Sequence, residues 1–179
     1  MATTSDETFG VAGQMGLPIF VGLRATEIAD LQRQLAPYRQ AWREAGHAGP
    51  PSVYLRIPVY VSTTERGAVE EPRESLTSFF ARQTELARAA VGRAGAGPAE
   101  RRSFQAERMA NLSYDDILAK KVAFGTPARL IERLTELRQE LGIDGILLEP
   151  NSGGLLPPAL ERESLRLFTH EVMPAFRRS

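Results

Sequence analysis

Cysteine is absent from the 179-residue chain, which excludes a disulfide framework and any metal site built from thiolates. The two histidines, His47 and His170, lie too far apart in sequence to form a recognisable metal motif, so we expect no metal. Lysine plus arginine and aspartate plus glutamate number 22 each. The resulting formal net charge of zero predicts neither nucleic acid nor an anionic membrane as a partner.

Long hydrophobic runs are also missing from the chain. No run approaches the roughly 20 apolar residues of a membrane span, and residues 1–6 have neither the basic flank nor the hydrophobic core of a signal peptide. These absences predict a cytoplasmic protein. With 42% hydrophobic residues, the chain is able to bury a sizeable core, and we expect a single domain over residues 1–179.

The stretch Lys121–Gly154 predicts a strand, a helix and a second strand. A short apolar run at 122–124 ends at a glycine, and Thr126 followed by Pro127 is typical of a helix start. The leucines that follow recur at three- and four-residue steps, which places them on one face of a helix. A second apolar run occupies 143–148. Because a crossover helix lets two strands point the same way, we expect these strands to be parallel neighbours.

The rest of the chain alternates in the same manner, and four strands alternating with helices predict an α/β fold with a parallel sheet. Residues 91–103 are rich in glycine, alanine and proline and predict a flexible insertion. A complete (β/α)8 barrel needs about 250 residues, so the chain is either a small open sheet or the second half of a barrel. The other predicted elements are helices at 8–15, 26–45, 63–90, 104–120 and 160–172 and strands at 17–22 and 52–62.

The polar start of the chain has two interpretations. Thr4 or Ser5 is suited to cap the helix that follows, and Asp6 and Glu7 suit the positive end of its dipole. Hydroxyls and free N–H groups at a helix start are also able to hold a phosphate. The two carboxylates oppose that second interpretation, because they repel an anion.

Four segments of the chain resemble the bacterial luciferase-like flavin-dependent monooxygenases, and they follow one another in the order of that family. The family fold is a (β/α)8 barrel. The resemblance therefore implies the C-terminal half of a TIM barrel, with about four parallel strands alternating with helices. The segments are TSDETFGVAGQMGLPIFVG at 4–22, YRQAWREAGHAGPPSVYLRIPVYVS at 38–62, FGTPARLIERLTELRQELGIDGILLEPNSGG at 124–154 and LRLFTHEVMPAFR at 165–177.

The same resemblance implies a site, because the family binds a reduced flavin at the carboxyl ends of its strands. The family histidines and arginines that support catalysis or grip the phosphate lie in its first four strands, so no catalytic residue is assigned here. The residues implied are Thr4, Ser5 and Thr8 for the flavin phosphate, Gly22 and Leu23 for the ring, and Asn151, Ser152, Gly153 and Gly154 for the substrate mouth.

As a function, the resemblance implies a bacterial monooxygenase that uses reduced FMN and dioxygen on a small organic substrate. Related enzymes use a deazaflavin coenzyme, and this cofactor stays open as an alternative. Because the chain has no counterpart of the family's first four strands, we expect a truncated or split chain that associates with a missing N-terminal half. The alternative is a non-catalytic half barrel, a flavin-binding or interaction protein that self-associates as a homodimer.

Overall fold

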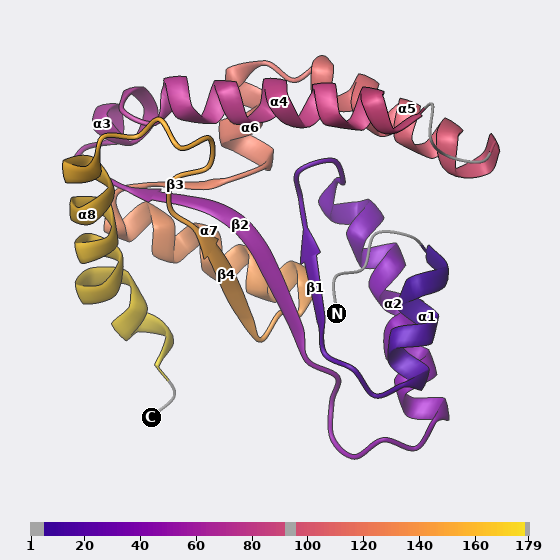
Figure 1. The fold of residues 1–179 in the computed structure, drawn as a ribbon. Helices are drawn as coiled ribbons and strands as arrows, with labels where there is room; N and C mark the ends of the chain where they lie inside the picture. The colour runs from indigo at the N-terminus through magenta and orange to yellow at the C-terminus, as the bar shows by residue number, and fades with distance from the viewer. Residues whose placement is uncertain (1–5, 92–95, 178–179) are drawn as a thin grey trace. The chain divides into compact units, whose positions relative to one another are not determined.

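The computed structural model describes residues 6–91 and 96–177. The chain divides into two compact units, and Figure 1 shows the helices and strands that make them up. The first unit consists of the described residues up to Ile57 together with Leu134–Leu148. The second unit consists of Pro58–Arg133 and the described residues from Glu149 onward. A single domain over residues 1–179 therefore stays a prediction.

The first unit is built on a parallel sheet. Strand β1 pairs with β2 from Ile19 opposite Val53 to Gly22 opposite Arg56, and β4 also pairs with β2. The elements of this unit are α1 (Asp6–Gln14), β1 (Ile19–Gly22), α2 (Ile28–Glu44), the start of β2 (Val53–Val61), the end of α7 (Pro127–Leu141) and most of β4 (Gly145–Glu149).

The pairing of β4 corrects one expectation from the sequence. The apolar runs at 122–124 and 143–148 were expected to form neighbouring strands, but the second run pairs with β2. The Asp144 amide donates to the carbonyl oxygen of Val53 at 2.8 Å, and the Val53 amide donates to the Asp144 carboxylate at 2.9 Å. This double link fixes the start of β4 beside the start of β2.

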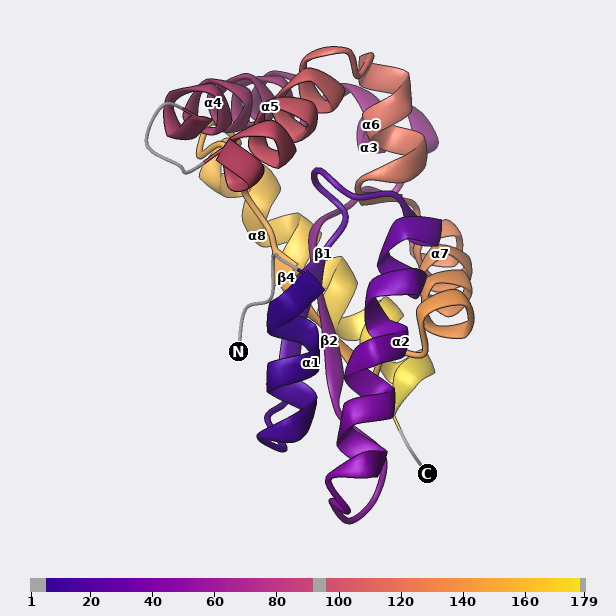
Figure 2. The ribbon, with the colours of Figure 1, turned by 90° about the vertical axis from the view of Figure 1, so that its right-hand side faces the viewer.

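Helices α1 and α2 cover one face of this sheet. Alternate residues of β1 are buried, so Ile19 and Val21 face the helices while Phe20 is 38% exposed on the other face. Figure 2 shows α1 and α2 packed along each other. Helix α2 continues through Pro37 as one helix. The helices approach closely because residue 13 of α1 is a glycine.

The second unit contains the carboxyl end of β2, which pairs with β3 in parallel from Val59 opposite Ala123 to Val61 opposite Gly125. A buried apolar cluster forms its core, with Leu76, Phe80, Ile117 and Val122 at its centre. The further elements of this unit are α3 (Glu65–Glu70), α4 (Arg73–Val91), α5 (Ala96–Ala110), α6 (Tyr114–Lys120), β3 (Ala123–Gly125), the start of α7, α8 (Pro158–Leu167), a π-helical turn (Phe168–Val172) and a 3₁₀ turn (Met173–Phe176).

The structure places part of the segment 91–103, expected to be a flexible insertion, in helix α5, and its flexibility stays a prediction. Val91 ends α4, residues 92–95 lie outside the described part of the chain, and residues 96–103 belong to α5. Helices α4 and α5 pack against each other. The alanines and the charged residues of this segment favour a helix, and tertiary packing outweighs the glycine and proline at its start. None of the described helices has the length and apolar character needed to cross a membrane.

Candidate functional site

The loop that follows β4, residues 150–156, is organised around the side chain of Asn151. Its amide oxygen accepts the main-chain N–H of Leu156 at 3.0 Å. Its amide nitrogen donates to the Leu156 carbonyl at 3.3 Å and to Glu161 Oε2 at 2.9 Å. The oxygen and both amide hydrogens are therefore used inside the protein. Asn151, expected at the substrate mouth, holds the shape of the loop.

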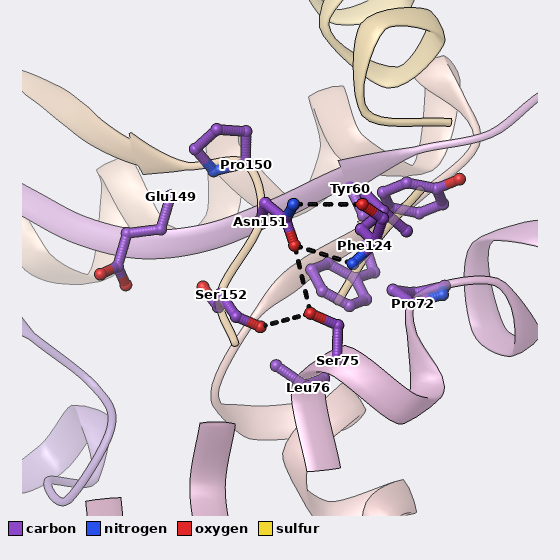
Figure 3. Close-up of a pocket in the computed structure, with 10 residues that line it drawn as sticks. Tyr60, Pro72, Ser75, Leu76, Phe124, Glu149, Pro150, Asn151 and Ser152 are labelled. Atoms are coloured by element: carbon purple, nitrogen blue, oxygen red, sulfur yellow. Dashed lines mark hydrogen bonds between the residues drawn. The ribbon is translucent and has the colours of Figure 1, made fainter. Parts of the chain in front are cut away.

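A second anchor of the loop comes from α4, far away in sequence. The Ser75 hydroxyl lies 2.9 Å from the carbonyl oxygen of Ser152 and 3.2 Å from Asn151 Oδ1, so its single proton is shared between two acceptors (Figure 3). The same oxygen accepts the main-chain N–H of Leu155 at 3.1 Å. Ser75 is 4% exposed. It thus links three residues of the loop to the helix.

Two glycines let the loop come this close to α4. Gly153 has φ +108° and Gly154 has φ +76°, a backbone region that residues with a Cβ rarely adopt. A Cβ on Gly153 would lie 2.0 Å from the carbonyl oxygen of Ser75, whereas a Cβ on Gly154 would meet nothing within 4 Å. Gly153 is therefore required by both backbone conformation and space, and Gly154 by conformation alone.

A small cavity of about 10 Å³ lies beneath the loop, which is the room that about one water molecule needs. Ser152 is one of its lining residues, and the Ser152 hydroxyl is buried with no hydrogen-bond partner among the described residues. The other residues that line the cavity are Tyr60, Pro72, Ser75, Leu76, Phe124, Glu149, Pro150, Asn151 and Leu156 (Figure 3).

The Tyr60 side chain forms one wall of this cavity and is fixed at both ends. Its hydroxyl donates to Glu71 Oε2 at 2.6 Å, and its ring meets the Phe124 ring edge-on at 5.9 Å between centroids. Burial raises the pKa of Tyr60, and the hydrogen bond and negative charge of Glu71 raise it further. The hydroxyl is therefore protonated at neutral pH and acts as a hydrogen-bond donor that is already engaged.

The residues expected at the flavin are described only in part. Thr4 and Ser5 lie outside the described residues. Thr8 is half-buried in the first turn of α1, where the first main-chain N–H groups have no partner within the helix. Gly22 is the exposed last residue of β1, and Leu23 directly after it is 1% exposed.

The first unit brings these described flavin candidates to one end. Helix α1 runs back along β1, so its first turn and the carboxyl end of β1 lie at the same end (Figures 1 and 2). A Cβ at Gly22 would make only ordinary contact, 3.5 Å from the Arg56 carbonyl oxygen. Packing therefore does not require glycine there. The substrate-mouth candidates 151–154 belong to the second unit.

Sequence reasoning missed Ser75 as part of the substrate-mouth loop. The signal available was weak: Ser75 lies one helical turn before Phe79, so a small hydroxyl residue falls on the apolar face of its helix. Nothing local in the sequence connects Ser75 to a loop 76 residues further on. In the described part of the chain, no group of three or more histidine and acidic side chains is placed to hold a metal ion.

Comparison with known proteins adds a family and a fold. Residues 1–145 match the family profile described as luciferase-like monooxygenase. No curated protein matches the chain. Among solved structures, the monooxygenase RslO1 from Streptomyces bottropensis is 18% identical, with a TM-score of 0.66, and the match covers 98% of this chain and 47% of that one.

Two further solved structures are similar over nearly the whole chain. One is the oxygenating constituent of 3,6-diketocamphane monooxygenase from the CAM plasmid of Pseudomonas putida, in complex with FMN, at 20% identity and a TM-score of 0.69, covering 97% of this chain and 46% of that one. The other is the coenzyme F420-dependent tetrahydromethanopterin reductase from Methanopyrus kandleri, at 15% identity and a TM-score of 0.65, covering 99% and 50%.

These likenesses lie below 25% identity and show the fold. The predicted α/β fold, with parallel strands alternating with helices as in the C-terminal half of a (β/α)8 TIM barrel, is confirmed. The chain spans about half the length of the solved relatives described above.

Proposed function

The chain belongs to the luciferase-like monooxygenase family, and from this premise we propose that it contributes a flavin-phosphate site and a substrate loop to a flavin-dependent oxidoreductase. The observation that carries the flavin site is the family match over residues 1–145, which includes the first turn of α1 and the end of β1. The substrate loop follows residue 145, and its assignment rests on the resemblance of residues 124–154 to the family. Reduced FMN is the cofactor proposed, and a deazaflavin coenzyme is the alternative. The substrate is a small organic molecule.

The phosphate end of the cofactor is assigned to the first turn of α1. A helix start offers main-chain N–H groups and the positive end of the helix dipole, both of which favour an anion. The Thr8 hydroxyl, half-buried in that turn, adds a donor. Asp6 and Glu7, the first two residues of α1, both carry carboxylates that oppose the phosphate. The helix start therefore has to supply enough attraction to outweigh two negative charges.

The ring end of the cofactor is assigned to the carboxyl end of β1. Gly22 is exposed and its missing Cβ leaves the strand end open to close approach. Leu23 is apolar and buried, so it keeps water away from this end of the strand. A bound reduced flavin supplies the reaction with dioxygen, and the residues of this chain hold the phosphate, orient the ring and exclude water.

Titration of the purified chain with FMN tests the proposal. Riboflavin lacks the phosphate and serves as the ligand control. We expect saturable quenching of FMN fluorescence, and in the double variant Ser5→Ala, Thr8→Ala we expect affinity for FMN to fall about tenfold, because hydrogen bonds to a charged group are lost. Binding of riboflavin should be unchanged by the two substitutions.

Thr169→Ala is the matched control variant. The Thr169 hydroxyl is exposed and donates only to carbonyl oxygens of its own helical segment, Leu165 at 2.9 Å and Arg166 at 3.0 Å. This variant should bind FMN as the wild type does. Absence of FMN binding by a folded wild-type chain would overturn the proposal, and so would a double variant that binds FMN with unchanged affinity.

A further inference from the structure

The loop of residues 150–156 is tied to α4 by one buried side chain. The Ser75 hydroxyl donates toward Ser152 and Asn151 and accepts the N–H of Leu155. These contacts join positions 76 to 80 residues apart in sequence. All of them lie within the second unit. The loop is thus hydrogen-bonded to a residue that belongs to another element.

Two features of the loop conformation are unfavourable in free energy, and the hydrogen bonds of Ser75 must offset them. Gly153 and Gly154 both stand in the left-handed backbone region, and glycine loses more conformational freedom on ordering than any other residue. The Ser152 hydroxyl is buried with no hydrogen-bond partner among the described residues, which makes this conformation of the loop less favourable. Asn151 closes the loop on itself through Leu156, but its bonds to Leu156 do not reach α4.

The geometry points to Ser75 as a positioning residue, whose hydroxyl latches the substrate loop onto α4. This inference rests on the proposed function for the identity of the loop as a substrate loop. Ser75 is assigned no contact with the cofactor or the substrate. It acts through Asn151, Ser152 and Leu155, which it holds in one arrangement.

Amide hydrogen exchange in the variant Ser75→Ala tests the latch. Loss of the hydroxyl removes the partner of the Leu155 N–H directly. If Ser75 holds the whole loop, the amides of Gly154 and Leu156, which donate to Asn151, should also exchange about tenfold faster, as expected for the loss of one net hydrogen bond. Faster exchange of Leu155 alone, or of none of the three, would overturn the inference.

Ser164→Ala is the matched control. Ser164 is 3% exposed, and its hydroxyl accepts the buried N–H of Val61 at 2.8 Å, so this variant also leaves a buried main-chain N–H without its partner. It should lower thermal stability as Ser75→Ala does, yet leave exchange in the loop unchanged. Equal acceleration of loop exchange in both variants would mean general destabilisation and would also overturn the latch.

A spectroscopic readout separates loop position from stability. The chain has no cysteine, so Leu155→Cys, at a side chain that is 50% exposed, accepts a single nitroxide label. Ser75→Ala in this background should increase label mobility, and Ser164→Ala should not. An unchanged spectrum would contradict the latch. Failure of the wild-type chain to bind FMN would overturn the proposed function and leave the result on the latch standing.

Discussion

The Tyr38 hydroxyl is buried in the first unit among main-chain carbonyl groups. It donates to the Leu17 carbonyl oxygen at 2.9 Å and lies 3.3 Å from that of Ser52, and the residue has no exposed surface. Burial, with a smaller contribution from the charge of Asp144, raises the pKa of Tyr38 to about 12. The folded chain therefore holds this proton more tightly than the unfolded chain, whose tyrosines titrate near 10.

We expect Tyr38→Phe to lower the free energy of unfolding by about 1–2 kcal/mol at pH 7, because the carbonyl of Leu17 loses its donor. The stabilisation from the raised pKa is complete below about pH 10 and is lost as the pH rises toward 12. The difference in free energy of unfolding between wild type and variant, measured by urea denaturation, should therefore be smaller at pH 11 than at pH 7. A difference that stays constant from pH 7 to 11 would contradict this account.

The packing of helix α1 on helix α2 depends on one glycine, Gly13. A Cβ on Gly13 would lie 2.4 Å from the Tyr38 carbonyl oxygen and 2.9 Å from Ala41 Cβ, and backbone atoms cannot give way as a flexible side chain does. We expect Gly13→Ala to push the helices apart and to lower the free energy of unfolding by about 1–3 kcal/mol, the range typical of overpacking. Urea denaturation measures the effect.

Gly10→Ala is the matched control in the same helix. A Cβ on Gly10 would meet nothing within 4 Å, so this variant should gain up to ~1 kcal/mol of stability from the higher helix propensity of alanine. Opposite signs for the two variants are the expected result. If both substitutions stabilise the chain, α1 does not pack on α2 as described.

The elements that local patterns predicted were those with strong periodicity or clear boundaries. Thr126 followed by Pro127 and the leucine repeat predicted α7, and the strand predicted at 52–62 is β2. The pairing of β4 with β2 was not predictable in this way. The sequence predicted β3 as the neighbour of β4, but β3 has only three residues, and the local pattern of so short a strand does not indicate which strand lies beside it. Tertiary contacts decide such pairings.

At the candidate site, too, local sequence patterns predicted some features, while tertiary contacts decided the others. A glycine-rich turn after β4 was predictable from Asn151–Gly154, but the use of the Asn151 side chain to close the loop depends on where Leu156 and Glu161 fall after folding. Ser75 reaches the loop only through the packing of α4. The assignment of Thr8, Gly22 and Leu23 to a flavin came from the family resemblance, and it stays a prediction.

For the whole molecule, the feature that bears most on association is the edge of the sheet at β1, which is available to pair with another strand. Strand β1 has one partner among the described strands, β2. Phe20 of β1 is 38% exposed on the face away from α1 and α2, and its ring stacks on that of Tyr54 at 5.4 Å between centroids. An edge strand with an exposed aromatic residue favours association with another chain.

We therefore expect the chain to self-associate over the micromolar range in sedimentation velocity, where incompletely covered sheets are prone to associate. Phe20→Lys should shift the distribution toward the monomer, because a lysine on an edge strand opposes pairing. Leu86→Lys, at a residue that is 55% exposed on α4, makes the same chemical change on another element and should leave association unchanged. Dissociation by Leu86→Lys with no effect of Phe20→Lys would assign the contact to α4 and reject the edge of β1 as the associating surface.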